Sequence, residues 1–168
     1  IEHPQELINK SQYKEFYNHP RLGAADYRLI EHTSNLRTAY TFCMCPGGHI
    51  VPAGSDAHGC VVNGMSASHR NSPFANSGMV VEIRPEDLHT NNNTTPFYTT
   101  LHHATPALAG LRFQQELERL AFEHGSAPSI APAQRLRDFV EGRKSSTLPA
   151  CSYLPGVRSS SMHEWLPE

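Results

Sequence analysis

The stretch TFCMCPGGHIVPAGSDAHGCVVNGMS, residues 41–66, decides the fold and contains three of the four cysteines of the chain. It begins inside an alternating run that predicts a β-strand over residues 37–45. Large apolar side chains gain most from burial, so the bulky face of this strand is expected to meet the core. That face carries Tyr40, Phe42 and Met44. The two thiols, Cys43 and Cys45, would then lie together on the opposite, open face.

Short strand-like runs surround this stretch on both sides. A run at 27–33 precedes it, and residues 34–36 lie in hairpin position between the two strands. Further short strands are expected at 49–53, 59–63 and 79–83. No helix of crossover length separates them, and antiparallel pairing is therefore expected.

Helices flank the strands. Pro4 predicts a short helix over residues 4–10, because a proline in the first turn loses no hydrogen bond. A longer helix is expected from Thr105 to Gly125, with an apolar stripe that contains Phe113 and Leu117. Another is expected over 132–141, burying Leu136, Phe139 and Val140. The order of elements predicts an α+β fold, a mostly antiparallel sheet of short strands with packed helices.

Composition bounds the function classes. A chain of 168 residues with 38% hydrophobic residues fits one domain over 1–168. Fourteen basic and sixteen acidic residues give a net charge of -2, and this balance predicts no nucleic-acid partner. No apolar run approaches the roughly 20 residues of a membrane span, and no signal peptide is evident. We therefore expect a cytoplasmic protein without a disulfide scaffold.

Two interpretations of the cysteine-rich stretch remain open. Cys43, Cys45 and Cys60, with nearby histidines, could hold a structural zinc ion, although C-x-C within a strand aims two sulfurs at one ion poorly. Gly47 and Gly48 could form a plain hairpin turn, or could let a flat ligand approach the backbone. The C-x-x-C, G-x-G-x-x-G, Walker A and G-x-S-x-G motifs are all absent.

Several phrases resemble one family when they are taken together and in this order. They are IEHPQ at residue 1, FCMCPGG at 42, VVNGMS at 61, FANS at 74, APAQR at 131 and SYLPGV at 152. The combination is similar to the middle of the large bacterial FAD-dependent dehydrogenases, described as NAD(FAD)-utilising dehydrogenases. The FCMCPGG and NGMS phrases together are distinctive, whereas either alone would be weak.

The resemblance implies the inserted, substrate-side domain of a larger flavoprotein, inactive alone. It implies FAD in the full-length parent and none in this chain alone, a flanking FAD-binding Rossmann domain as partner, and an unidentified small-molecule substrate. The abrupt ends agree with an excised insert, which we expect to self-associate through its exposed domain interface. Residues 89–103 would be a flexible local insertion. No catalytic residue is assigned, and the residues expected to face the flavin or substrate are Cys43, Cys45, Gly47, Gly48, Asn63, Met65, Ser66 and Arg135.

Overall fold

The computed structural model describes residues 1–34, 36–54, 56–88 and 106–167. The chain divides into two compact units. The first comprises Ile1–Val51, Asn63–Glu82 and Cys151–Leu154, and the second comprises Pro52–Val62, Ile83–Ala150 and Pro155–Glu168. A single domain over 1–168 stays a prediction, and the expected flexible insertion at 89–103 lies outside the described residues.

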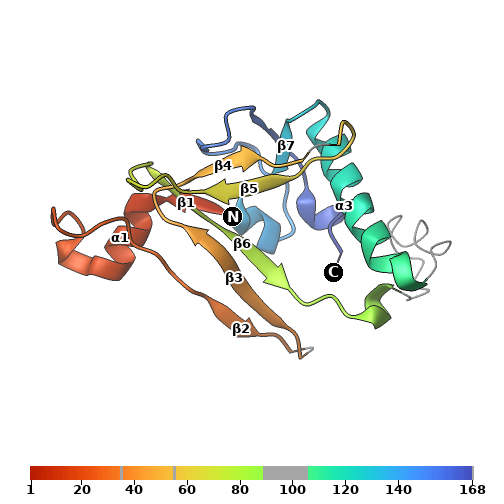
Figure 1. Ribbon diagram of the computed structural model, residues 1–168, viewed down its shortest axis with the longest axis horizontal. Helices are drawn as coiled ribbons and strands as arrows, with labels where there is room; N and C mark the ends of the chain where they lie inside the picture. Colours follow the sequence, from red (N-terminus) through yellow and green to blue (C-terminus); the bar gives the residue numbers. More distant parts are fainter. Residues whose placement is uncertain (35, 55, 89–105, 168) are drawn as a thin grey trace. The chain divides into compact units, whose positions relative to one another are not determined.

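The first unit is built on a four-stranded sheet. Its strand order is β1-β6-β3-β2, with β6 between β1 and β3 (Figure 1). The strands are β1 (Glu2–Pro4), β6 (Phe74–Val81), β3 (Thr38–Cys45) and β2 (Ile30–His32). Each neighbouring pair is antiparallel. Together with the helices, this sheet confirms the predicted α+β fold.

A β-bulge interrupts β3 close to its end. Phe42 pairs with Gly78 and Cys45 with Asn76, so that three steps along β3 match two steps along β6. The backbone of Cys43 adopts the left-handed conformation, with φ 48°. An extra residue in this conformation shifts every later side chain of the strand to the other face.

The predicted assignment of strand faces is wrong both before and after the bulge. Phe42, expected in the core, is 57% exposed, whereas Thr41 on the opposite face is buried. Cys45 shares its face with Phe42, because the residues opposite them, Asn76 and Gly78, are two apart on β6. Cys43 and Cys45 therefore do not form the common thiol face that regular alternation predicts.

The core of the first unit lies on the Thr41 side of the sheet. It consists of Ile8, Ala25 and Ala75, against which the partly buried Tyr27 and Met44 pack. Ile8 comes from helix α1 (Gln5–Tyr13), which confirms the predicted N-terminal helix and extends it by one turn at its end. Of the bulky residues expected in the core, only Met44 reaches it, since it follows the bulge.

Between β3 and β6 in the chain, β4 (His49–Pro52) and β5 (Val62–Met65) form a separate two-stranded ribbon (Figure 1). The turn at residues 46–48 leads from β3 into this ribbon. Gly47 is buried there, and its N–H donates to the Gln5 side-chain oxygen at 2.6 Å. The predicted strand 49–53 is confirmed, and the next one begins three residues later than expected.

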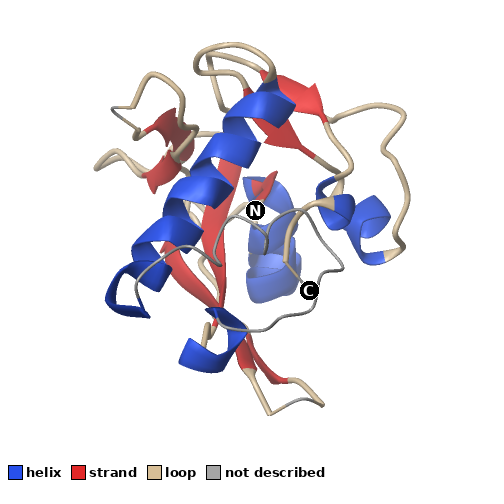
Figure 2. Ribbon diagram, turned by 90° about the vertical axis from the view of Figure 1, so that its right-hand side faces the viewer, coloured by secondary structure: helices blue, strands red, loops and turns tan. Residues whose placement is uncertain are grey.

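The second unit contains the long helix α3 (Ala109–Gly125), seen along its full length in Figure 2. Gly125 ends it as predicted, and Ser126 follows in the left-handed conformation. The expected start at Thr105 lies outside the described residues. Within the part that the structure describes, α3 is preceded by the 3-10 helix η4 (Pro106–Leu108), and a second short 3-10 helix, η2, spans Pro85–Leu88.

The predicted helix over 132–141 is wrong in its first half and in its burial. Residues Ala131–Ala133 form β7, which pairs in parallel with β8 (Val157–Ser159). Their backbone groups are engaged in this pairing, so the helix starts later, as α4 (Leu136–Val140). Its apolar side chains, expected to be buried, are exposed, at 51% for Leu136, 37% for Phe139 and 76% for Val140.

Candidate functional site

The residues predicted to face a ligand fall into two groups. Seven belong to the first unit, whereas Arg135 belongs to the second. In the first unit, Cys43, Asn63 and Met65 are exposed, and Cys45 and Ser66 are half-buried. Gly47 and Gly48 are buried. The exposed group offers a thiol, an amide and a thioether to a ligand, and all three side chains belong to the first unit.

Three polar side chains form a row across the sheet on the Phe42 side. Asn76 on β6 stands opposite Glu2 on β1 and opposite Cys45 on β3. Residues directly opposite each other in antiparallel strands point to the same face and lie within contact distance. Without the bulge, Cys45 would have faced the other side, and so the bulge creates this row.

Gly64 of β5 covers the row. A Cβ atom at Gly64 would lie 2.0 Å from Asn76 Oδ1 and 3.2 Å from Cys45 Sγ. A Cβ at Gly48 would lie 2.6 Å from the Met65 carbonyl oxygen and 3.0 Å from Cys45 Cβ. We call the residues Cys45, Gly48, Gly64, Met65 and Asn76 the Cys45–Asn76 cluster. It joins three of the predicted site residues, Cys45, Gly48 and Met65, to two others.

The glycines at 47 and 48 are required by the chain's own backbone. A Cβ at Gly47 would lie 1.8 Å from the Arg70 carbonyl oxygen, and Gly47 has a φ of 53°. The Arg70 carbonyl lies against Gly47, and the Met65 carbonyl lies against Gly48. These two carbonyl groups occupy the space that a flat ligand would need to approach the glycines. These glycines thus set the shape of the turn, and a ligand would contact its outer surface.

Most polar groups around the cluster already have partners. The Glu2 carboxylate accepts the Ser152 N–H at 3.0 Å and also a short bond from the Ser152 hydroxyl. Ser152 Oγ in turn accepts the Ile50 N–H at 2.7 Å. Ser66, another predicted site residue, donates its hydroxyl to the Pro46 carbonyl at 2.9 Å. These contacts fix the ends of β1 and β4 around the row.

Asn76 differs from these neighbours. The residue is only 3% exposed, and among the described residues its Nδ2 has no hydrogen-bond partner. Buried side-chain donors are almost always paired in folded proteins, so an unpaired one calls for an explanation.

The opposite face of the sheet holds a second polar chain. His3 Nε2 lies 2.8 Å from the Tyr27 hydroxyl, which lies 2.7 Å from Ser77 Oγ. Burial lowers the pKa of His3, and burial raises the pKa of Tyr27. Both shifts favour the neutral forms, which suits side chains that pack beside the core.

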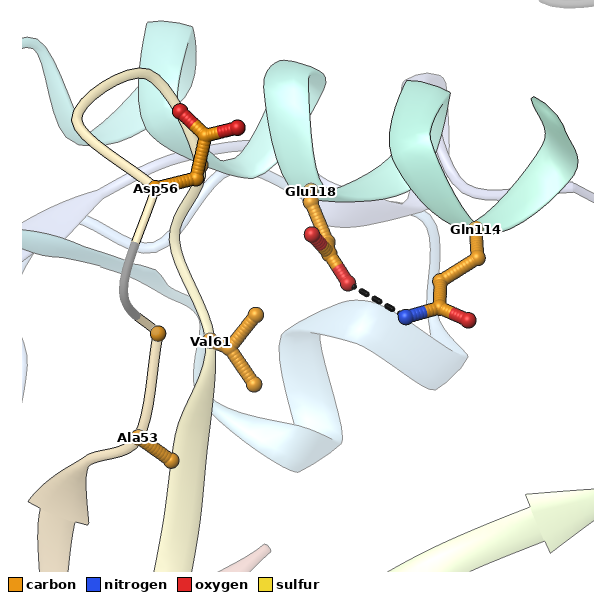
Figure 3. A pocket seen from close by; sticks show the side chains of 7 residues that line it. Ala53, Asp56, Val61, Gln114 and Glu118 are labelled. Carbon is orange, nitrogen blue, oxygen red and sulfur yellow. Dashed lines mark hydrogen bonds between the residues drawn. The ribbon is translucent and has the colours of Figure 1, made fainter. Parts of the chain in front are cut away.

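The second unit contains a small open pocket next to α3 (Figure 3). Its volume is about 300 Å³. Glu118 accepts the Gln114 side-chain N–H at 2.8 Å, and Asp56 accepts the His58 backbone N–H at 2.8 Å. Both carboxylates therefore serve local structure, and the pocket combines them mainly with small residues. Its lining residues are Ala53, Gly54, Asp56, Gly59, Val61, Gln114 and Glu118.

The zinc alternative gains no support from the geometry. Over the residues that the structure describes, no three His, Cys, Asp or Glu side chains gather in a way that could hold a metal ion. Cys43, Cys45, Cys60 and Cys151 are free thiols. The bulge separates the first two, and Cys60 belongs to the second unit.

Comparison with known proteins identifies the family. The model of the family described as "FAD-dependent protein, C-terminal domain-like" matches residues 1–168. The chain belongs to this family. An uncharacterized protein of Clostridium beijerinckii (strain ATCC 51743 / NCIMB 8052) is 42% identical over 171 residues, which cover all of this chain and 30% of that relative.

Membership confirms the resemblance inferred from the sequence, and this FAD-dependent family domain is therefore associated with flavoproteins. The chain spans less than a third of the length of the relative it matches. In the described part of the chain, no helix is long and apolar enough to cross a membrane.

Residue-level reasoning did not find Glu2, Asn76 or Ser152 as parts of the site region. Each nevertheless lies in a phrase that carries the family resemblance, at residues 1–5, 74–77 and 152–157. Those phrases are far apart in the sequence, and the Glu2–Ser152 bonds and the β1–β6 pairing bring them together. Gly64 lies in the VVNGMS phrase, at residues 61–66.

Proposed function

We propose that the first unit supplies the substrate-side wall of the flavin site in an FAD-dependent oxidoreductase, and that this chain does not catalyse alone. Two facts support the proposal, the family match and the geometry of β3. A flavin would supply the hydride transfer, whereas this chain would supply orientation and electrostatics. The FAD itself would be held mainly by a flanking Rossmann domain of a longer protein.

The observation that carries the proposal is the bulge at Cys43. A non-glycine residue held in the left-handed conformation stores strain, and such residues cluster at ligand sites. Bulges are also enriched beside active sites, where they redirect a side chain. Here the strained residue presents an exposed thiol, and the bulge moves Cys45 into the row with Asn76.

The proposed roles follow from exposure. Cys43, Asn63 and Met65 would contact the flavin or the substrate, whereas Cys45 and Ser66 would shape the wall beneath them. Gly47 and Gly48 would hold the turn that carries this surface. These residues are proposed for contact and shape, and none is assigned as a catalytic acid or base.

Arg135 is proposed as a binding residue for a substrate carboxylate or phosphate. Its side chain is exposed, while its backbone N–H donates to Ser145 Oγ at 2.9 Å. Ser145 is almost fully buried and also donates to the Asp138 carboxylate at 2.8 Å. The guanidinium thus extends from a fixed backbone position.

The experiment replaces Cys43 with alanine in the longer flavoprotein, and Cys60 with alanine as a matched control from the second unit. We expect Cys43→Ala to change the visible flavin spectrum and to lower kcat/KM, and Cys60→Ala to change neither. An unchanged spectrum together with unchanged kinetics in Cys43→Ala would remove the wall from the flavin site. For the isolated chain, an absorbance spectrum with a stoichiometric flavin band would contradict the proposal that the flanking domain holds the cofactor.

A further inference from the structure

One end of the four-stranded sheet is apolar and exposed. Three of its strands, β2, β3 and β6, lie side by side there (Figure 1). Ile30 on β2 and Val80 on β6 both stand opposite Tyr40 on β3, so the three side chains form a row on one face. Phe42 lies on the same face, two residues along β3 from Tyr40. Ile30 is 53% exposed and Phe42 57%, and a contiguous exposed apolar group of this kind marks an interaction surface.

The other face of the same end is exposed as well. Met79 stands opposite Thr41, and Val81 stands opposite Ala39. This is the side on which the core of the first unit lies, but the core does not reach these two residues, because Met79 is 47% exposed and Val81 44%. The six exposed or half-buried residues Ile30, Tyr40, Phe42, Met79, Val80 and Val81 are called the open end of the sheet.

The strands of the open end have the sequence of strands that are covered on both faces. Neither β3 nor β6 contains a charged residue, and residues 79–81 are three consecutive apolar residues. A strand with one solvent face normally alternates apolar and polar side chains, whereas a continuous apolar run is typical of cover on both sides. The first unit, as far as it is described, leaves both sides bare.

The length of the relative and the position of Cys43 select what covers the open end. The similarity to the Clostridium beijerinckii protein covers only 30% of that protein, so most of its length lies outside the region that resembles this chain. The proposed function places FAD, held by a flanking domain, at the exposed Cys43 thiol. Phe42 precedes Cys43 directly and is itself exposed, so a domain that brings FAD to Cys43 also comes to the open end.

We propose that the open end of the sheet is the docking surface for the FAD-carrying domain of a longer flavoprotein, and that apolar side chains of that domain cover both faces of β3 and β6. This proposal rests on the proposed function, from which it takes the flanking domain, and it adds the surface through which the two domains meet. Because these strands carry no charge, the contact is apolar and its strength depends little on ionic strength.

Two exposed methionines of the first unit provide the test. Met79 belongs to the open end, whereas Met65, which is 57% exposed, belongs to the proposed flavin wall. Hydrogen peroxide converts an accessible methionine to its sulfoxide, and mass spectrometry locates the modified residue. The reaction is followed in the dark on the dilute isolated chain and on the longer flavoprotein, with and without FAD.

We expect docking to protect Met79 and FAD to protect Met65. A docked surface that is open no more than about 10% of the time slows oxidation of Met79 by about tenfold or more relative to the isolated chain. This protection should be present with and without FAD, whereas Met65 should be protected only when FAD is bound. The FAD-bound protein and the isolated chain alone decide the result for Met79, so this comparison does not depend on a folded apoprotein.

A matched pair of variants tests the same surface. Val81→Glu places a charge in the open end, and Val62→Glu places the same charge on β5 at a valine of nearly equal exposure, 43% against 44%. An unpaired charge is costly only where it becomes buried. We therefore expect Val81→Glu, and not Val62→Glu, to restore rapid oxidation of Met79 in the longer flavoprotein.

The outcomes separate this proposal from the proposed function. Equal oxidation rates of Met79 in the isolated chain and in the longer flavoprotein would overturn the docking surface, and protection of Met65 by FAD would still support the wall. Protection of Met79 with no effect of FAD on Met65 would support the docking surface and remove Met65 from the wall. Slow oxidation of Met79 in the isolated chain would also overturn the proposal. Recovery on dilution would then identify a second copy of this chain as the cover, and no recovery would show that the chain covers the open end by itself.

Discussion

Replacing Gly47 with alanine tests the tightest backbone approach in the first unit. The new Cβ would lie 1.8 Å from the Arg70 carbonyl oxygen, far inside any real contact distance. Gly47 also has a φ of 53°, a conformation that alanine adopts only with strain. The Arg70 carbonyl cannot move away easily, because the turn is held by the Arg70 N–H to Ala67 and by the Ser72 N–H to the Gly47 carbonyl.

The magnitude follows from these two contributions. A left-handed non-glycine residue costs about 1–2 kcal/mol, and overpacking of a buried position typically costs about 1–3 kcal/mol. We therefore expect Gly47→Ala to lower the free energy of unfolding by about 2–5 kcal/mol. Against a typical total of about 5–15 kcal/mol, this is a large fraction.

The assay is urea denaturation followed by far-ultraviolet circular dichroism. With a typical urea dependence of about 2 kcal/mol per molar, the midpoint of Gly47→Ala should fall by about 1–2.5 M. Gly23→Ala is the control, because no atom lies within 4 Å of the added Cβ and the φ of Gly23 is not in the left-handed region. A Gly47→Ala midpoint equal to that of Gly23→Ala would refute the packing of this turn.

Three further predictions concern buried polar groups. Ser152→Ala removes the hydroxyl that donates to Glu2 and accepts from the Ile50 N–H, while the backbone N–H to Glu2 is kept. The loss should cost about 1–3 kcal/mol in urea denaturation, and an unchanged midpoint would contradict the importance of this hydroxyl. Burial raises the pKa of the Cys60 thiol, so alkylation near neutral pH, followed by mass spectrometry, should be slower in the native chain than in the denatured one. Because this folded pKa is raised, its contribution to stability is complete below the unfolded pKa and is lost as pH rises through the folded value. Hydrogen bonding to Arg119 lowers the pKa of Glu116. The contribution of Glu116 to stability is therefore present above its unfolded pKa and is lost as pH falls through its folded pKa. In thermal melts, Glu116→Gln should show a weaker loss of stability in acid than the wild type, and identical pH profiles would exclude this contribution.

Local patterns predicted the elements of the first unit better than their faces. The hairpin between the strands at 30–32 and 38–45 and the N-terminal helix both follow from alternation and from Pro4, and the structure contains them. The face assignment was wrong at Phe42 because the bulkier face of the strand does not meet the core, and wrong at Cys45 because it assumed unbroken alternation through Cys43. Glycine or asparagine would have marked a left-handed residue there, and cysteine gives no such signal.

The Cys45–Asn76 cluster depends on information that no local pattern contains. Asn76 meets Cys45 only through the register of β3 on β6, and Glu2 meets Asn76 only through β1. The short strand β1 is three residues long, too short to show a period. For the same reason the start of the helix at 132–141 was misplaced, since the pairing of Ala131–Ala133 with β8 is made with residues more than twenty positions away.

The bulge also changes the chemistry that is open to the C-x-C pair. In a regular strand the C-x-C pair would share one face and would invite interpretation as a dithiol or as half of a metal site. The extra residue instead leaves Cys43 exposed at a strained position and moves Cys45 beside Asn76, so the two sulfurs have different surroundings. The exposed thiol of Cys43 at this strained position is the feature on which the proposed contact with the flavin rests.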